Sequence, residues 1–291
     1  MRRRDGLTDG MSRDIDALTS STLKHLRDRW WNPEFTDFLR ETLEPLPGQR
    51  ILDVGCGVGT ADVRLGQLGI SQVKFFGIDL MVPRVREAVA SARAHNLQVG
   101  FAAADVCKLP FRNHAFDSSF CVAVLQHVRE LSAAVEQFAR VTKPGGRVLV
   151  VEPDNGARYW YSSSELGARA FALATRFFTA LEGGGDATDS AVGPKVSALF
   201  ERHGIEPVEI RLFPVSLVRL GAPAPAVWKA RHDIVRGTID RVPEESLRQL
   251  GAEYLRVLDA YAEEAAAAGR RFVEIQSTML FATIGQKPAA H

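Results

Sequence analysis

The 291-residue chain has few cysteines, no long apolar run and almost no net charge. Its three cysteines, Cys56, Cys107 and Cys121, are too scattered for a disulfide framework. They also lack the paired spacing of a zinc site, so we expect no metal. No stretch approaches the ~18 apolar residues of a membrane span. The first 20 residues are polar and charged, unlike a signal peptide. We therefore expect a cytoplasmic protein.

The formal net charge is +1, with 46% hydrophobic and 24% charged residues, as in an ordinary globular protein. Such a balance gives no overall field to attract nucleic acid or an anionic membrane. The charge is also balanced within the appended segments, because residues 1–48 contain eight Lys/Arg and nine Asp/Glu, and residues 202–271 contain eleven Lys/Arg and ten Asp/Glu. An RNA-binding surface is usually basic. We expect a small-molecule substrate, and neither nucleic acid nor a membrane as partner.

Apolar runs and helical patterns alternate along the first half of the chain. Strands are predicted near residues 50–54, 73–78, 97–102, 116–122 and 147–151. Helices are predicted between them, at about 60–68, 82–95 and 130–141. This alternation predicts an α/β fold, with a parallel sheet covered by helices on both faces.

The flanking segments follow a different pattern. Residues 14–46 have helical periodicity interrupted at Pro33, which predicts two helices. After Glu152 the simple alternation stops. Further helices are predicted at 163–181, 194–203, 224–239 and 244–268, with strands at about 205–213 and 272–284.

One glycine-rich turn stands at the end of the first predicted strand. The run from Ile51 to Thr60 reads ILDVGCGVGT, with Asp53 two residues before three alternating glycines. The carboxyl end of a parallel strand is where open α/β sheets bind ligands. The spacing is G-x-G-x-G, and not the G-x-G-x-x-G of a dinucleotide site. It suits close backbone approach by a nucleoside that bears an amino acid, with Asp53 as partner for the ammonium group.

The turn resembles motif I of the class I S-adenosylmethionine (SAM)-dependent methyltransferases, and further segments resemble the same family in order. Residues 75–80 (FFGIDL) are similar to the second strand with its acid, and 104–106 (ADV) to the loop that meets adenine. Residues 116–121 (FDSSFC) and 143–151 (KPGGRVLVV) are similar to the fourth and fifth strands. The resemblance spans residues 50–152. It implies a Rossmann-like sheet of seven mostly parallel strands, the last one antiparallel, and SAM as cofactor.

The resemblance also implies roles for single residues. Gly55, Gly57 and Gly59 would let the backbone approach the methionine part of SAM, with Cys56 a small residue in the same tight loop. Asp53 would fix that end and Asp79 would accept the ribose hydroxyls. Leu80 and Met81 would pack on adenine, and Asp105 and Val106 would read its edge. The backbone carbonyl of Cys121 would meet the methionine ammonium.

Two residues are candidates for catalysis. His127 follows the fourth strand, where many small-molecule members of the family have a histidine, and a histidine can accept a proton near neutral pH. A hydrogen-bonded or capping histidine is the alternative. Glu152, at the tip of the fifth strand, either orients substrate or caps the next turn.

The appended segments suggest a lid around a substrate chamber. We divide the chain into a disordered tail (1–12), an N-terminal helical cap (13–48), a SAM-binding core (49–152) and a lid insertion (153–193). A core helix and strand (194–213), a second helical lid insertion (214–271) and the last strand with its tail (272–291) follow. The lids would stand over the carboxyl edge of the sheet; a role in forming an oligomer, such as a homodimer, is the alternative. Aromatic residues that could line the chamber, if they are not core residues, are Trp30, Tyr159, Trp160, Tyr161 and Trp228.

An aromatic wall favours a flat or apolar acceptor. We therefore expect methyl transfer to an oxygen, nitrogen or carbon of a small aromatic or heteroaromatic molecule of specialised metabolism, such as a phenol or indole. Methylation of RNA or protein is the main alternative. A non-catalytic SAM-binding protein and a nicotinamide oxidoreductase are the others, the last disfavoured by the glycine spacing.

Overall fold

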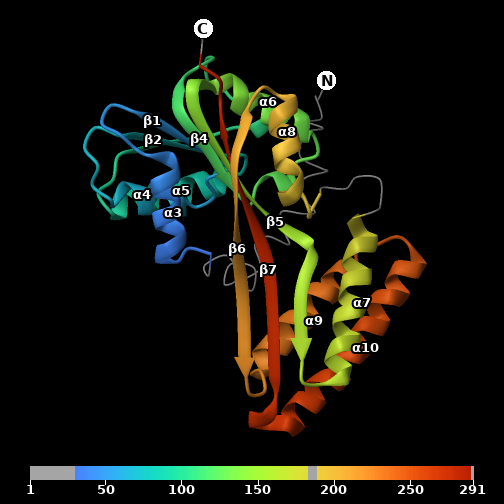
Figure 1. The fold of residues 1–291 in the computed structure, drawn as a ribbon. Helices are drawn as coiled ribbons and strands as arrows, with labels where there is room; N and C mark the ends of the chain where they lie inside the picture. Colours follow the sequence, from blue (N-terminus) through green and yellow to red (C-terminus); the bar gives the residue numbers. More distant parts are fainter. Residues whose placement is uncertain (1–29, 183–188, 290–291) are drawn as a thin grey trace, which may run out of the picture. The chain divides into compact units, whose positions relative to one another are not determined.

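The computed structural model describes residues 30–182 and 189–289 (Figure 1). The predicted tail and the first of the two N-terminal helices lie outside these residues. The second begins where the sequence predicts, as α3 (Pro33–Leu43). Pro33 occupies the first turn, where its missing N–H costs nothing. The side chain of Asn32 accepts a 2.8 Å hydrogen bond from the N–H of Phe35 and caps the helix.

A seven-stranded sheet in the order β3-β2-β1-β4-β5-β7-β6 forms the fold. The strands β1 to β5 pair in parallel, and the chain runs through β7 in the opposite direction to its neighbours (Figure 1). The fold class predicted from the sequence is confirmed. The strands are β1 (Arg50–Val54), β2 (Lys74–Asp79), β3 (Val99–Ala103), β4 (Phe116–Val122), β5 (Thr142–Ser162), β6 (Glu206–Leu220) and β7 (Val273–Gln286).

Helices connect the strands at the places where helical periodicity predicts them. The longer ones bury one apolar face; α6, for example, buries Ala134, Val135, Phe138 and Val141. Besides α3, the helices are α4 (Thr60–Gly66), α5 (Val82–Ala94), α6 (Leu131–Val141), α7 (Glu165–Glu182), α8 (Val196–Arg202), α9 (Pro225–Ile239) and α10 (Glu245–Ala268).

The predicted ends of two strands are wrong. β5 continues past Glu152 to Ser162, and β6 continues past Pro214 to Leu220. In β5, side chains alternate in exposure only near the end of the strand, with Tyr159 and Tyr161 exposed and Trp160 half-buried between them. In β6, Pro214 suggests a strand end, but β6 lies at the edge of the sheet, where a missing N–H is tolerated.

The described chain divides into two compact units. We name residues 32–155, 189–214 and 279–289 the sheet unit, and residues 156–182 and 215–278, with Trp30 and Trp31, the helical unit. The core of the sheet unit is built from residues of β1, β4, β5, α6 and α8, among them Leu52, Phe116, Phe138 and Phe200. The sheet unit also contains the carboxyl ends of β1, β2 and β4, where a ligand site is expected.

The helical unit has its own core. Helix α10 contacts both α7 and α9, and Phe177, Leu258, Tyr261 and Phe272 are buried among them. These helices match the predicted ones within two residues at each end. Within the described residues, no helix combines the length and apolar character needed to cross a membrane.

Candidate functional site

The glycine turn lies between β1 and α4, at the carboxyl end of β1. The N–H groups of Gly55 and Cys56 both donate to the carbonyl of Ile78 in β2, at 2.7 and 2.8 Å, which draws the turn against the neighbouring strand. A Cβ added to Gly55 would lie 2.3 Å from Cγ2 of Val124, so only glycine fits there. A Cβ added to Gly57 would meet nothing within 4 Å. The turn therefore packs on one side and is open at Gly57, where a ligand can reach the backbone.

Asp79 connects this turn to the end of β2. One carboxylate oxygen accepts a 3.0 Å hydrogen bond from the N–H of Gly57, and the other accepts a 2.8 Å bond from the N–H of Met81. The side chain is 7% exposed. Asp79 thus fixes the open part of the glycine turn while keeping acceptor capacity for a further donor, because each carboxylate oxygen has two lone pairs.

Asp53 and Asp62 form a buried acidic pair at the two ends of the turn. Asp53 belongs to β1 and Asp62 to the first turn of α4, and they are 3% and 1% exposed. Burial, reinforced by the charge of Asp62 and a hydrogen bond between the two carboxyls, raises the pKa of Asp53 well above its usual range. Burial raises the pKa of Asp62 to about 7, although the hydrogen bond with Asp53 opposes this. At neutral pH and below, the pair holds a proton between its oxygens.

The predicted adenine contacts lie at the ends of the next two strands. Leu80 is 41% exposed and Met81 is half-buried, immediately after β2. Asp105 is exposed after β3, and one of its oxygens accepts a 2.8 Å hydrogen bond from the N–H of Cys107. This bond starts the short helical turn that contains Val106. The structure therefore places these residues at the carboxyl edge of the sheet unit; their contacts with adenine stay predictions.

Glu152 anchors the loop that follows β4. It is fully buried, and its Oε1 accepts hydrogen bonds of 2.7 Å from the N–H groups of both Val124 and Leu125. Its Oε2 accepts a 3.3 Å bond from the N–H of Gln126. Three successive backbone donors hold the carboxylate, so its chief effect is to position the loop. A direct catalytic contribution of Glu152 stays a prediction.

His127 ends the short helical turn Leu125–His127 in this loop. Its N–H donates a 2.9 Å hydrogen bond to the carbonyl of Val124, whose side chain faces Gly55. The side-chain amide of Asn155 donates a 3.2 Å hydrogen bond to the side-chain oxygen of the preceding residue, Gln126. His127 is half-buried and stands three residues from the contact with the glycine turn. The loop that carries the candidate base thus contacts the candidate cofactor turn through Val124.

Cys121 is fully buried in β4, with its thiol 3.9 Å from Oε1 of Glu152. Burial first, and then the nearby carboxylates, raise the pKa of the thiol well above its usual range, which keeps it neutral. Its side chain is part of the interior. The predicted role belongs to its backbone carbonyl and is compatible with that burial.

The aromatic residues predicted to contact substrate belong to the helical unit. Trp160 packs on Phe171 with ring centroids 4.0 Å apart, and Trp228 packs edge-on against Tyr261 at 5.0 Å. Trp160 and Trp228 therefore contribute to the core of that unit, whereas Tyr159 and Tyr161 are exposed on β5. Trp30 is half-buried at the first described position. Binding of substrate by any of the five stays a prediction.

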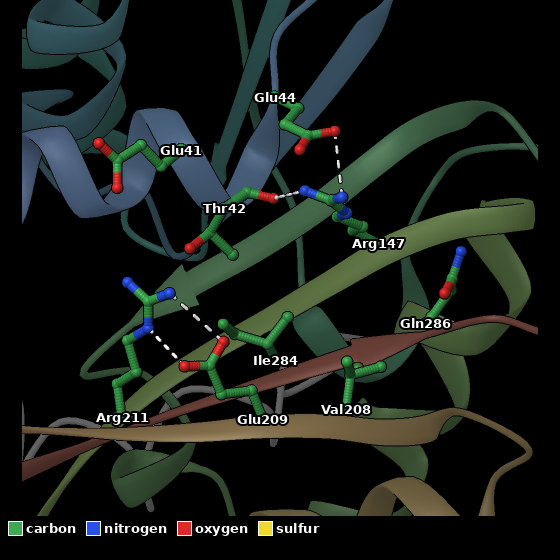
Figure 2. Close-up of a pocket in the computed structure, with 10 residues that line it drawn as sticks. Glu41, Thr42, Glu44, Arg147, Val208, Glu209, Arg211, Ile284 and Gln286 are labelled. Carbon is green, nitrogen blue, oxygen red and sulfur yellow. Dashed lines mark hydrogen bonds and ion pairs between the residues drawn. The ribbon is translucent and has the colours of Figure 1, made fainter.

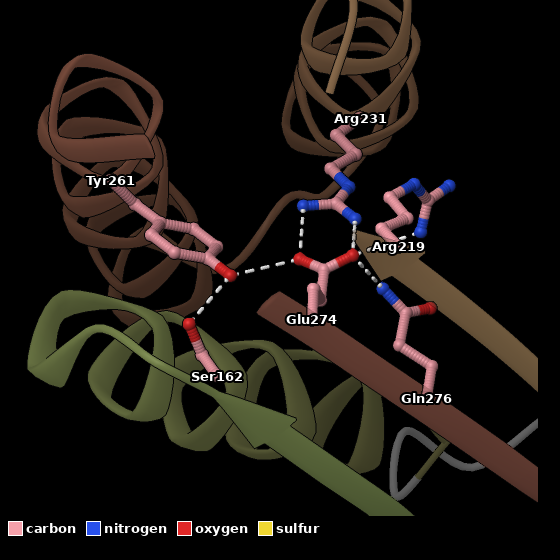
Figure 3. A network of polar contacts seen from close by, with 6 residues as sticks. All are labelled: Ser162, Arg219, Arg231, Tyr261, Glu274 and Gln276. Atoms are coloured by element: carbon pink, nitrogen blue, oxygen red, sulfur yellow. Dashed lines mark hydrogen bonds and ion pairs between the residues drawn. The ribbon is translucent and has the colours of Figure 1, made fainter. Parts of the chain in front are cut away.

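A polar network lies beside this aromatic cluster in the helical unit (Figure 3). Glu274 is fully buried and accepts hydrogen bonds from Arg219, Arg231, Tyr261 and Gln276. Burial pushes the pKa of Glu274 upward, but hydrogen bonds from Arg231 and Tyr261 and the charges of both arginines outweigh it and hold the pKa below its ordinary value. Every lone pair of this carboxylate is engaged, which indicates a structural network.

A cavity of about 250 Å³ is found elsewhere in the sheet unit, among α3, β5, β6 and β7 (Figure 2). Its two arginines are already paired: Arg147 lies 3.0 Å from Glu44, and Arg211 lies 2.7 Å from Glu209. None of the predicted site residues lines it. We do not assign it to the cofactor or the acceptor.

Sequence reasoning missed Asp62 and Val124. Asp62 has a recognisable signal, because it is an acid in the first turn of a short helix and its neighbours Ala61 and Val63 are buried. An acid in such a place needs a partner in the interior. Val124 gives no signal in sequence, because its contact with Gly55 depends on how two loops meet. Among the described residues, no cluster of His, Cys, Asp and Glu is arranged to hold a metal ion.

Comparison with known proteins finds similarity in the part of the chain that contains the glycine turn and the loop with His127. Residues 52–150 match a family model described as a methyltransferase domain. A demethylmenaquinone methyltransferase from Mycobacterium marinum is 32% identical over 145 residues, covering 50% of this chain and 56% of that protein. A ubiquinone biosynthesis O-methyltransferase from Proteus mirabilis is 25% identical over 172 residues, covering 53% and 67%.

A solved structure has the same fold. It is a putative methyltransferase from Bacillus halodurans, with a TM-score of 0.57 and 17% identity, covering 88% of this chain and all of that one. The chain spans little more than half the length of the first of the sequence relatives. The matched residues 52–150 lie within the sheet unit, so the helical unit falls outside the family match.

Proposed function

Because residues 52–150 form a methyltransferase domain of the class I SAM-dependent family, we propose that the whole chain transfers a methyl group from SAM to a small aromatic acceptor. One observation carries the proposal. The loop that carries His127 packs through Val124 on Gly55 of the glycine turn, so the loop with the candidate base contacts the turn expected to hold the methyl donor. The family match supports SAM as the cofactor.

The residues present fit this cofactor. Gly57 leaves open space at the backbone, Asp79 lies beside it with lone pairs to spare, and Asp53 and Asp62 form a buried acidic pair at the two ends of the turn. Asp79 would hold the ribose hydroxyls, and Asp53 the methionine end. Asp105, Val106, Leu80 and Met81 would hold adenine. SAM, when bound, supplies an electrophilic methyl group on a sulfonium sulfur.

His127 would take the proton of the acceptor. An acceptor hydroxyl loses its proton as its oxygen attacks carbon, and a histidine accepts that proton without a large pKa shift. Glu152 would act through this residue, since its hydrogen bonds to Val124, Leu125 and Gln126 fix the loop on which His127 stands. Correct alignment of the acceptor with the methyl donor itself contributes a large part of the rate acceleration.

The acceptor class rests on two supports. The names of the two sequence relatives refer to quinones, and one of them is an O-methyltransferase. The chain also places exposed tyrosines, Tyr159 and Tyr161, in the segment outside the family match. We therefore propose a phenol, hydroquinone or indole of specialised metabolism. Roles for residues 153–193 and 214–271 as lids, or as surfaces of a homodimer, stay predictions.

The experiment is product detection with methyl-labelled SAM and a panel of phenols, hydroquinones, amines and indoles. The proposal expects label in at least one aromatic acceptor and loss of that transfer in His127→Ala. If the protein binds SAM but labels only RNA or protein, the acceptor proposal fails. If SAM binds and no acceptor of any class is labelled, a non-catalytic SAM-binding function replaces it.

A further inference from the structure

Strand β6 stands last in the sheet order, so one side of its backbone has no neighbouring strand among the described residues. The N–H and C=O groups along such a side are a template for pairing with another strand. The part of β6 that belongs to the sheet unit runs from Glu206 to Pro214, and we name it the β6 edge. The side chains on its two faces decide which strand it can pair with.

One face of the β6 edge is apolar and exposed. Val208, Ile210 and Leu212 alternate along the strand, so they share this face, and they are 61%, 45% and 52% exposed. Single exposed aliphatic residues are common on protein surfaces, but a contiguous row of them marks an interaction site. This face therefore favours a partner that brings aliphatic side chains of its own.

The other face of the β6 edge carries one acid and one base. The Nε of Arg211 donates a 2.7 Å hydrogen bond to Oε1 of Glu209, and both side chains are almost half exposed (Figure 2). On the same face, Phe213 packs edge-on against Phe35 of α3, with ring centroids 5.6 Å apart. Because Glu209 and Arg211 lie two residues apart on an edge strand, the edge presents a negative and a positive group in a fixed order.

Natural edge strands usually carry features that prevent pairing, such as lysines, prolines or inward-pointing charges. The prolines of the β6 edge, Pro207 and Pro214, flank residues 208–212 and leave these five residues free of proline. The two charges among the five are opposite in sign, so they oppose pairing only in some registers. The edge therefore accepts a strand of matching pattern and rejects others.

We propose that the β6 edge pairs antiparallel with the β6 edge of a second copy of this chain, about a twofold axis at Ile210. In this register Ile210 lies opposite Ile210 of the second copy, and Val208 lies opposite Leu212 of the second copy. On the other face, Glu209 lies opposite Arg211 of the second copy, and the reciprocal pair forms as well. Aliphatic side chains thus meet aliphatic ones, and each carboxylate meets a guanidinium.

The positions of the two charges select this register. A twofold axis that passes through a residue places the residues of one face opposite residues of the same face. An axis at Glu209 would put two carboxylates directly opposite each other, and an axis at Arg211 would do the same with two guanidiniums. Like charges directly opposite destabilise a strand pair. Among these three neighbouring registers, only the axis at Ile210 pairs opposite charges.

Such pairing stops at two copies. Each chain has one β6 edge, and a twofold contact occupies the same surface on both partners. The strand at the other end of the sheet is β3, whose five residues carry no charge, so it offers no partner to Glu209 or Arg211. We therefore expect a closed dimer and not a filament. The inference depends neither on the cofactor nor on the proposed acceptor.

The test is sedimentation velocity over a range of protein concentrations, applied to charge-reversal variants. Glu209→Arg places an arginine opposite Arg211 of the second copy, and Arg211→Glu places a glutamate opposite Glu209 of the second copy. Each variant alone should dimerise at least roughly tenfold more weakly than the wild type. The matched control is Glu136→Arg, at an exposed position on α6, which should dimerise like the wild type.

A mixture of the two single variants is the decisive sample. A copy of Glu209→Arg then faces a copy of Arg211→Glu, so both cross-strand pairs again join opposite charges. We expect a heterodimer with an affinity close to that of the wild type. The doubly exchanged variant Glu209→Arg/Arg211→Glu should form a homodimer for the same reason. Mixing would not reverse a loss that came only from damage to the fold.

Ile210→Asp tests the apolar face, because it puts two carboxylates at the twofold axis. It should abolish the dimer, whereas Leu68→Asp, at an exposed apolar position after α4, should leave it unchanged. A wild type that stays monomeric up to about 0.1 mM would overturn the proposal. Single charge-reversal variants that dimerise like the wild type, or a mixture of them that stays monomeric, would overturn it as well.

Discussion

The buried carboxylate of Glu152 in β5 accepts a 2.7 Å hydrogen bond from the backbone N–H of Val124, which lies in the loop that carries His127. The same oxygen holds the next N–H, and the other oxygen holds the one after it. A single side chain of the sheet core thus fixes three consecutive peptide groups, and with them the position of the candidate base.

Replacing Glu152 should separate positioning from acid–base chemistry. Glu152→Ala leaves three N–H groups without their acceptor, and we expect a loss of roughly 3 kcal/mol in the free energy of unfolding. Glu152→Gln keeps one carbonyl oxygen for two of the donors and should lose about 1 kcal/mol. Urea unfolding measures both, with the exposed Glu136→Gln on α6 as control. Equal, negligible losses in both variants would show that the loop does not depend on this anchor.

His127→Ala should lower kcat by about 10²–10⁴, because a positioned general base contributes rates of that order. SAM affinity should be unchanged, since no role in cofactor binding is assigned to this side chain. The acidic limb of the pH–rate profile should also disappear in the variant. His95→Ala, at the exposed end of α5, is the control. An unaltered kcat in His127→Ala at every pH would leave a site that works by positioning alone.

The contact between the glycine turn and the His127 loop can be tested from both sides. Gly55→Ala would place a Cβ 2.3 Å from Val124 at a residue with a φ of +77°, so it should both clash and strain the turn. We expect SAM affinity to fall at least tenfold. The double variant Gly55→Ala/Val124→Ala should recover part of the loss, because it removes the clash and leaves the strain. Additive losses in the double variant would mean that the two loops are not coupled.

The acidic pair also predicts a pH dependence of stability. The folded pKa of Asp62 is raised to about 7, from near 3.9 in an unfolded chain, so between these values the folded state binds more protons. Stability without ligand should therefore be greatest at the acidic end of this window and fall as pH rises through it. Asp62→Asn has no such proton, so it should gain roughly 2 kcal/mol over wild type between pH 5 and pH 8. Thermal unfolding across this range measures the gain; a difference independent of pH would contradict it.

Much of the sheet unit follows from sequence, because its signals are local. Asp53 at the end of β1, the three glycines that follow it and Asp79 at the end of β2 each belong to a short local pattern, and parallel strands bring their carboxyl ends to one edge. His127 is recognisable by its place after β4. These residues lie at this edge because each ends or follows a strand, and their roles in binding and catalysis stay predictions.

Other features depend on long-range contacts. Nothing near Glu152 in sequence reveals that its donors are Val124, Leu125 and Gln126, almost thirty residues earlier. Pro214 is a strand-ending residue in most settings, and it lies within β6 because that strand is at the sheet edge. Trp160 and Trp228 suggest a ligand wall by composition, whereas their partners Phe171 and Tyr261 place them in a core.

The most direct test of the central claim is calorimetry of the protein with SAM, in parallel with Asp79→Ala. The account predicts one SAM bound per chain, and at least a tenfold weaker affinity in the variant, because Asp79 both anchors Gly57 and offers lone pairs to the ribose. Asp37→Ala, at an exposed position on α3, should bind SAM like the wild type. No binding of SAM to the folded wild-type protein would contradict the account.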